Sequence, residues 1–169
     1  MTNRFAESRF TPGAAVALAS VAWLLPVAMS FHANPGPANP SVLLWYASLR
    51  QPRWKPPDAM VPLAWTALQS GLACAAYRLL RAAPSRPRRR ALASLGYCVV
   101  MIGGWSRLFF KQRNLPVCLA AATTMVAAGT VYTSAARKVD GPAAAAGAPF
   151  VAWVSFATAL TWSIWRMNR

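Results

Sequence analysis

Acidic residues are nearly absent from this sequence. Only 3 of its 169 residues are Asp or Glu, against 18 Lys or Arg, and charged residues of both signs make up 12% of the chain. A soluble domain normally covers itself with roughly a quarter charged residues, so the composition argues against an ordinary soluble protein. Hydrophobic residues make up 56% of the chain, which excludes a disordered chain.

Residues that carry common chemistry are also scarce. The chain has one histidine, His32, and three cysteines, Cys74, Cys98 and Cys118. The cysteines lie within apolar runs without CxxC spacing, so neither a disulfide framework nor a zinc site is indicated. The sequence has no Ser/His/Asp set, no glycine-rich phosphate loop and no paired carboxylates. We therefore assign no catalytic residue and no metal ligand.

The few carboxylates limit the possible functions further. They are Glu7, Asp58 and Asp140, and all three fall near the ends of apolar runs. A proton relay across a membrane needs titratable groups in the membrane interior. Proton pumping and proton-coupled transport are therefore poor interpretations of this sequence.

Long charge-free runs dominate the chain instead. A bilayer core of ~30 Å needs about 20 helical residues to cross it, and a helix satisfies its own backbone polar groups there. We predict an all-α integral membrane bundle of five transmembrane helices in one domain, residues 14–169, after an N-terminal segment, residues 1–13. The predicted helices cover about residues 14–31, 60–80, 91–110, 115–136 and 144–165.

The first apolar run admits two interpretations. Arg4 and Arg9 precede it, as basic residues precede a cleaved signal segment, but its length and the lack of a clear A-x-A site favour a retained helix. The basic residues divide almost evenly between the two sides of a five-span chain, so the positive-inside rule gives no orientation. We expect a multi-pass membrane protein, and the sequence leaves open which membrane holds it.

The net charge of +15 raises the alternative of nucleic-acid binding, because clustered Lys and Arg release counterions from phosphates. The basic residues fall between the apolar runs, however, where cations meet lipid headgroups. We therefore expect the lipid bilayer, and no nucleic acid, as a partner. The linker at residues 82–90, which contains Arg86-Pro87-Arg88-Arg89-Arg90, is predicted to be a solvated anchor for anionic lipid.

The longest connection, His32 to Asp58, is a functional candidate because it is long and rich in proline. Its prolines are Pro35, Pro37, Pro40, Pro52, Pro56 and Pro57, which forbid a regular helix through most of it. Two tryptophans, Trp65 and Trp153, fall inside predicted helices, away from the expected interfacial belt. They either pack against neighbouring helices or form the wall of a site for a flat apolar ligand.

Three ordered motifs carry a resemblance to a known family. Residues 45–57, WYASLRQPRWKPP, followed by Trp65, resemble the WYxxLxxPxWxPP…W signature of the tryptophan-rich sensory protein family, also called the translocator protein or TspO/MBR family. Residues 105–110, WSRLFF, resemble the end of its third helix. Residues 149–168, with Trp153, Ser155-Phe156-Ala157-Thr158 and Asn168, resemble its fifth helix. The similarity spans about residues 14–169.

The resemblance implies a five-helix bundle, often dimeric, with a pocket open toward the first loop. The family binds porphyrins such as protoporphyrin IX, benzodiazepine-type ligands and, in some members, sterols. Carried over by matching position, the ligand-binding residues are Tyr46, Pro56, Trp65, Gln69, Trp105, Phe109, Trp153 and Ala157. Tyr46 and the loop prolines are expected to form a stiff lid, Trp65 and Trp153 to stack on the ligand, and Ala157 to leave room for it. A porphyrin is expected as ligand, and no cofactor is required.

Some positions depart from the family pattern. Ile102 stands where the family often carries Asn, and Thr161 where it often has a second Asn. The last predicted helix lacks the Tyr of the family's sterol-recognition pattern. A match of the form Leu72-x4-Tyr77-x3-Arg81 exists in the second helix, but such patterns are weak, so sterol binding is in doubt.

Several functions remain open at this stage. The leading one is a membrane receptor or sensor for porphyrins and similar flat apolar ligands, which affects their transport, turnover or stress signalling. The alternatives are an enzyme-like promoter of porphyrin degradation, a sterol-binding translocator and a structural scaffold. We also predict a homodimer through small-residue faces, with three candidates: Gly71-x-x-x-Ala75, Gly103-Gly104 and Ala143-x-x-x-Gly147.

Overall fold

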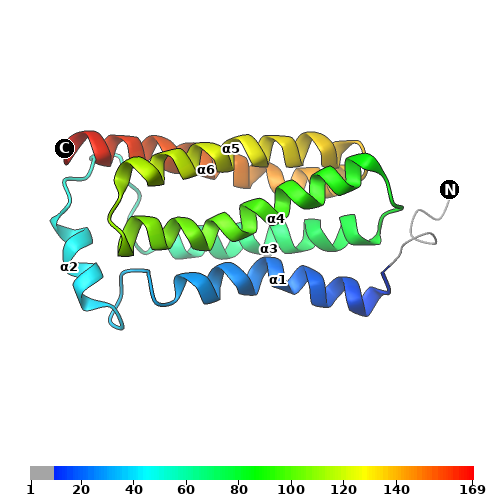
Figure 1. The fold of residues 1–169 in the computed structure, drawn as a ribbon, viewed down its shortest axis with the longest axis horizontal. Helices are drawn as coiled ribbons and strands as arrows, with labels where there is room; N and C mark the ends of the chain where they lie inside the picture. The colour runs from blue at the N-terminus through cyan, green and yellow to red at the C-terminus, as the bar shows by residue number, and fades with distance from the viewer. Residues whose placement is uncertain (1–9) are drawn as a thin grey trace.

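The computed structural model describes residues 10–169, and all regular structure in this part of the chain is helical (Figure 1). Most of the predicted N-terminal segment 1–13, with Arg4 and Arg9, lies outside the described residues. The elements are α1 (Pro12–Ser30), α2 (Pro40–Ser48), α3 (Met60–Arg81), α4 (Arg86–Ser106), the π-helical turn η1 (Arg107–Lys111), α5 (Leu115–Arg137) and α6 (Gly141–Met167).

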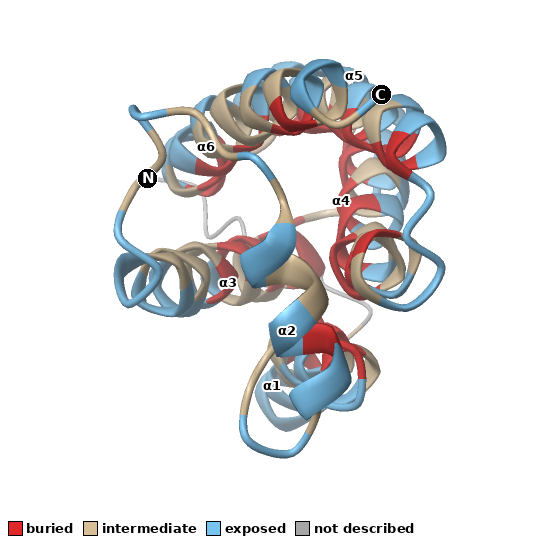
Figure 2. Ribbon diagram, turned by 90° about the vertical axis from the view of Figure 1, so that its left-hand side faces the viewer, coloured by how far each residue is buried: buried red, intermediate tan, exposed pale blue. Residues whose placement is uncertain are grey.

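The five long helices surround a common interior. Helix α1 packs against α3 and α4, α4 against α5, α5 against α6, and α6 back against α3. Figure 2 looks along the bundle from the end that carries α2, and the buried residues face inward. The short helix α2 lies across this end, where it contacts η1. The connection between α1 and α3 therefore covers one end of the bundle.

Within residues 10–169, four helices are long and apolar enough to cross a membrane: α1, the continuous α4–η1 segment, α5 and α6. This supports a multi-pass integral membrane protein. Helix α3 is not among the four, because polar residues such as Gln69 and two arginines in its last turn, Arg78 and Arg81, lower its apolarity. The five-span prediction is therefore supported for four spans.

Helix boundaries follow capping residues. The side chains of Thr11, Ser85, Asn114 and Asp140 each accept a hydrogen bond from the backbone N–H three residues later, and a proline occupies the first turn of each helix that follows. A side-chain N-cap and a proline in the first turn are both favoured at the N-terminus of a helix. Helix α4 thus begins at Arg86, five residues before the predicted start, because the charges that ended the apolar run do not end the helix.

The proline-rich connection contains one helix that the sequence did not predict. Helix α2 begins at Pro40, where the missing N–H costs nothing, and it ends at Ser48, four residues before Pro52. Pro40 is the first residue of the helix and the next proline is Pro52, so no proline interrupts the nine-residue helix. The rest of the connection is irregular, as predicted.

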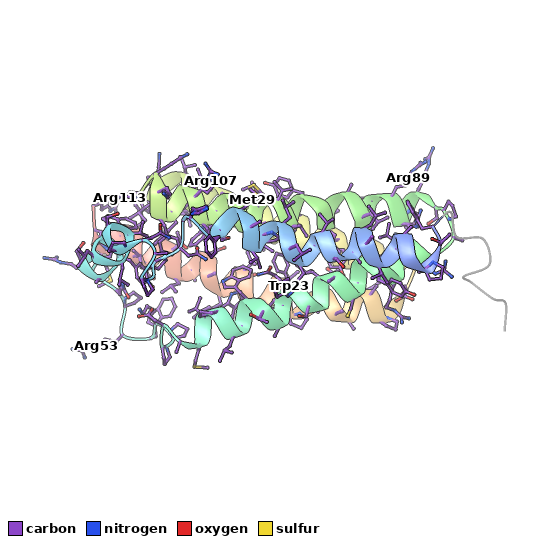
Figure 3. All side chains as sticks on the ribbon, turned by 90° about the horizontal axis from the view of Figure 1, so that it is seen from below. Trp23, Met29, Arg53, Arg89, Arg107 and Arg113 are labelled. Atoms are coloured by element: carbon purple, nitrogen blue, oxygen red, sulfur yellow. The ribbon has the colours of Figure 1, made fainter. Side chains whose placement is uncertain are left out.

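The linker at residues 82–90 corrects another prediction. Arg88 is only 5% exposed, and its guanidinium donates hydrogen bonds to the carbonyl oxygens of Leu79, at 2.6 Å, and Leu80, at 3.0 Å. It therefore binds two carbonyls in the last turn of α3, where the usual donor four residues later is missing; the Leu79 oxygen also accepts from the Ala82 N–H, at 3.3 Å. The prediction of a solvated anchor is wrong for Arg88. Arg89, by contrast, is exposed and extends from the bundle end (Figure 3).

The small-residue faces predicted for a dimer pack mostly within one chain. A methyl group on Gly71 would lie 3.0 Å from the Ala146 carbonyl oxygen of α6. A methyl group on Gly103 would overlap Met29 of α1, and one on Gly147 would overlap the ring of Tyr132 of α5. These glycines permit close helix packing inside the bundle. Gly104, by contrast, meets only Met101 of its own helix, at 3.9 Å, and the homodimer and its face stay predictions.

Candidate ligand site between α3 and α6

The predicted site residues lie toward the end of the bundle that carries α2, in two groups of aromatic rings. The α3–α6 cluster consists of Trp54, Trp65, Trp153 and Phe156. The α2–η1 cluster consists of Trp45, Tyr46, Trp105, Phe109 and Phe110. The first group joins two long helices, and the second fastens α2 to the bundle.

The α3–α6 cluster brings Trp65 and Trp153 into contact with each other. Their ring centroids are 6.4 Å apart and their planes meet at 85°, an edge-to-face contact. Trp153 also lies 5.7 Å from Phe156, which in turn contacts Trp54 at 5.6 Å. Both Trp65 and Trp153 are partly buried, so each ring keeps a surface that other groups can cover.

An apolar groove adjoins this cluster on the surface between α3 and α6. Its volume is about 490 Å³, within the range of small-molecule sites. The lining residues are Pro56, Ala64, Ala67, Leu68, Pro149, Ala152, Trp153 and Phe156. The predicted residues Pro56 and Trp153 line it, whereas Ala157 does not, although it is partly buried and adjacent to Phe156 in sequence.

Two buried polar atoms in this region have no hydrogen-bond partner. They are Oε1 of Gln69 and Nε1 of Trp153. Gln69 follows Trp65 by four residues, so the two side chains share a face of α3, and Gln69 is only 7% exposed. Buried polar atoms in native proteins nearly always have a hydrogen-bond partner, so an atom without one needs an explanation. The structure thus leaves one buried acceptor and one buried donor unpaired; Trp153 lines the groove, and Gln69 does not.

The α2–η1 cluster uses its rings for contacts within the chain. Trp105 stacks on Phe109 at 4.8 Å with an interplanar angle of 20°, and Phe109 is 2% exposed. The indole N–H of Trp105 donates to the carbonyl oxygen of Cys118, at 3.1 Å. Tyr46 contacts Phe109 and Phe110 edge-on. The structure therefore brings Tyr46, Trp105 and Phe109 together where α2 packs against η1.

Tyr46 is also fastened to the far end of the connection. Its hydroxyl donates to Oδ1 of Asp58, at 3.4 Å, and Lys55 Nζ lies 2.6 Å from the same oxygen. Burial raises the pKa of Tyr46. Burial acts to lower the pKa of Lys55, but the hydrogen bond to Asp58 and the nearby Tyr46 raise it overall. At neutral pH Tyr46 is thus a donor and Lys55 a cation.

Sequence reasoning missed Trp54 and Phe156 as site residues. Trp54 lies inside the WxPP part of the quoted motif, and Phe156 follows Trp153 by three residues, on the same helix face. Both signals were present in the sequence. A second apolar groove, of about 580 Å³ between α1 and α3, contains Trp23 and Tyr77 but none of the predicted ligand residues.

Comparison with known proteins assigns the chain to a family. The sequence pattern of the TspO/MBR family matches residues 16–166. The human protein named translocator protein is 28% identical over 129 residues, which cover 75% of this chain and 76% of the human one. The tryptophan-rich sensory protein of Cereibacter sphaeroides is 30% identical over 138 residues, 78% of this chain and 84% of that protein. This chain belongs to the TspO/MBR family.

Proposed function

We propose that the protein is a membrane receptor or sensor that binds porphyrins and similar flat apolar ligands beside the α3–α6 cluster. The observation that carries the proposal is the pair of unpartnered atoms, Gln69 Oε1 and Trp153 Nε1, next to aromatic rings and an apolar groove. Ligand sites of this kind combine mostly apolar walls with a few polar groups that fix orientation.

The chemistry of a free-base porphyrin suits this arrangement. Its flat ring system offers a large apolar face for stacking on indole and phenyl rings. Its carboxylate groups accept hydrogen bonds, and a carboxyl group in its protonated form donates one. Binding would therefore give Trp153 Nε1 an acceptor and Gln69 Oε1 a donor, and would remove the cost of leaving both atoms unpaired.

The proposal includes α3 as the fifth transmembrane helix. At 22 residues its length is about 33 Å, which matches the bilayer core. Its two arginines lie in the last turn. Arg78 forms an ion pair with Asp140 at 2.7 Å, and Arg81 donates to the carbonyl oxygen of Phe10 at 2.6 Å. Arginines near a helix end reach the interface, where their charge is tolerated.

Of two further expectations, the homodimer is kept in the proposal and sterol binding is not. A homodimer remains part of the proposal because the family resemblance implies one, without an assigned face. Sterol binding through the Leu72, Tyr77 and Arg81 pattern is not proposed, because Leu72 is fully buried and cannot share an outer surface with Tyr77, which lines the groove between α1 and α3.

A fluorescence titration tests the binding proposal. The detergent-purified protein is titrated with protoporphyrin IX, and quenching of tryptophan emission is followed. We expect saturable quenching with one dissociation constant, because Trp65 and Trp153 lie at the site. Quenching that rises linearly with porphyrin, to the same extent as for free tryptophan in the same detergent, would contradict the proposal.

A further inference from the structure

The residue after α6 reaches back to the connection between α2 and α3. Oδ1 of Asn168 accepts a hydrogen bond from the Arg50 backbone N–H, at 2.9 Å, and its Nδ2 donates to the Arg50 carbonyl oxygen, at 2.8 Å. Nδ2 also donates to the carbonyl oxygen of Ile164, at 2.7 Å. One side-chain amide thus joins the end of α6 to a backbone unit 118 residues away in sequence.

The segment that Asn168 holds, residues 50–58, is here called the strap. Beyond Arg50, the strap meets α6 through apolar contacts. The ring of Trp54 lies against Phe156, and Pro56 lines the α3–α6 groove together with Trp153. The strap therefore follows α6 from its last residue to the ligand site.

Within the described residues, the two bonds between Asn168 and Arg50 are the hydrogen bonds that connect the strap to α6. Other hydrogen bonds of the strap run to α2 or stay within the strap: Gln51 donates to the carbonyl oxygen of Tyr46, the Tyr46 hydroxyl donates to Asp58, and Lys55 donates to Asp58 and to the carbonyl oxygen of Pro52. Trp54 is 50% exposed. The strap is thus held to α6 by one polar attachment and a few partly exposed apolar contacts.

An amide is the side chain that fits this attachment. The Arg50 backbone offers one donor and one acceptor in extended chain after α2, and Asn supplies the complementary acceptor and donor. Aspartate supplies acceptors alone, so it would keep the bond from the Arg50 N–H and lose the bond to the Arg50 carbonyl oxygen. Alanine would lose both bonds.

We infer that Asn168 is a positioning residue that holds the strap closed over the α3–α6 site and thereby sets the rate of ligand exchange. The part that concerns ligand exchange rests on the proposed function. Asn168 contacts the strap and none of the predicted ligand residues, so its loss should raise the association and dissociation rates together. The dissociation constant should change little, because the contacts in the site remain.

The first measurement needs no ligand. Asn168→Ala is compared with the parent and with Met167→Ala, a neighbouring exposed residue, in limited trypsin digestion followed by mass spectrometry of cleavage after Arg50 and Arg53. We expect cleavage about tenfold faster in Asn168→Ala, because two neutral hydrogen bonds are lost, an intermediate rate for Asn168→Asp and the parent rate for Met167→Ala. Thermal unfolding of each variant checks that the bundle stays folded.

The second measurement follows dissociation of protoporphyrin IX by stopped-flow fluorescence in the same variants. Faster cleavage together with dissociation about tenfold faster would support the inference. Unchanged cleavage in both Asn168 variants would overturn it, and so would faster cleavage with unchanged dissociation, since the strap would then not control exchange. If the parent binds no porphyrin while Asn168→Ala is cleaved faster, the proposed function fails, the attachment stands and control of exchange is rejected.

Discussion

At the scale of single residues, the interior of the described bundle contains few polar side chains, and two of them have an atom without a hydrogen-bond partner. Tyr132 is fully buried, yet its hydroxyl donates to the carbonyl oxygen of Ala143, and Trp105 donates to Cys118. Gln69 and Trp153 each keep one atom unpaired. Since leaving a buried polar atom unpaired costs about 1–3 kcal/mol, this contrast supports the proposed ligand site beside the α3–α6 cluster.

Trp65→Ala and Trp153→Ala should each weaken porphyrin binding. Stacking a flat ring on an aromatic side chain is worth roughly 1–3 kcal/mol, which corresponds to about 5- to 150-fold in affinity. Fluorescence titration on variants that keep the parent melting temperature measures the change, and Trp→Phe should cost less because part of the ring face remains. Trp162→Phe is the control, because Trp162 is 46% exposed and touches neither cluster. Parent affinity in both alanine variants would leave the two rings as ordinary helix packing.

Gln69→Leu should affect stability and binding in opposite directions. Replacing an unsatisfied buried amide by an apolar side chain of similar size removes a cost of about 1–3 kcal/mol, so the melting temperature of the ligand-free protein should rise. Affinity for protoporphyrin IX should fall, because the acceptor is gone. Differential scanning fluorimetry and titration measure the two effects, with the exposed Gln112→Leu as control. A lower melting temperature without ligand would mean that Gln69 is already satisfied.

At the scale of elements, small residues set how closely the helices approach. Gly147 of α6 lies against the ring of Tyr132 of α5, and the Tyr132 hydroxyl reaches Ala143 one turn earlier on α6. A side chain at Gly147 would have to displace a fully buried ring that is also hydrogen-bonded. The contact between α5 and α6 therefore depends on this glycine.

Gly147→Ala should destabilise the monomer. The added methyl group would overlap Tyr132, and overpacking of this kind typically costs 1–3 kcal/mol. Gly141→Ala, in the first turn of the same helix, is the matched control, because a methyl group there meets nothing within 4 Å. Thermal unfolding in detergent should separate the two variants. Equal melting temperatures would show that α5 and α6 adjust freely to the larger side chain.

Helix extents could be predicted from the sequence where apolarity and capping coincide. Helix α5 was predicted as 115–136 and spans Leu115–Arg137. The predicted start of α4 is five residues too late. An apolar run shows only the part of a helix that lies in the bilayer core, whereas the helix itself starts where Ser85 caps it and Pro87 stands in its first turn. Helix α2 was missed because the prediction considered how many prolines the connection has and not where they stand. Pro40 stands at the first position of the helix, where proline is favoured.

The candidate site was only partly predictable for a similar reason. The family resemblance implied that Trp65 and Trp153, on the second and fifth predicted helices, share one pocket, and the structure brings the two rings together. Spacing cannot show which polar atoms find partners, so the free atoms of Gln69 and Trp153 and the bound N–H of Trp105 appear only in three dimensions. Asn168 and Arg50 are 118 residues apart in the sequence, so no local sequence pattern predicts their contact.

At the scale of the whole molecule, α3 decides the topology. The start of α1 and the end of α6 lie at opposite ends of the bundle (Figure 1), as expected for an odd number of crossings. Arg53 precedes α3 and Arg89 follows it, and both are exposed, at opposite ends of the bundle (Figure 3). If α3 crosses the bilayer, these two positions face opposite aqueous compartments.

Cysteine labelling at these positions tests the fifth span. Arg53→Cys and Arg89→Cys are each placed in a Cys74→Ala background, because Cys98 and Cys118 are buried and Cys74 is exposed. In sealed vesicles, a membrane-impermeant maleimide should label one position before lysis and the other only after it. Arg113→Cys, at the same end as Arg53 (Figure 3), should behave like Arg53→Cys, because an even number of crossings, α3 and α4, separates them. Labelling of Arg53→Cys and Arg89→Cys from the same side would show that α3 does not cross, and the chain would then have the four spans of α1, α4–η1, α5 and α6.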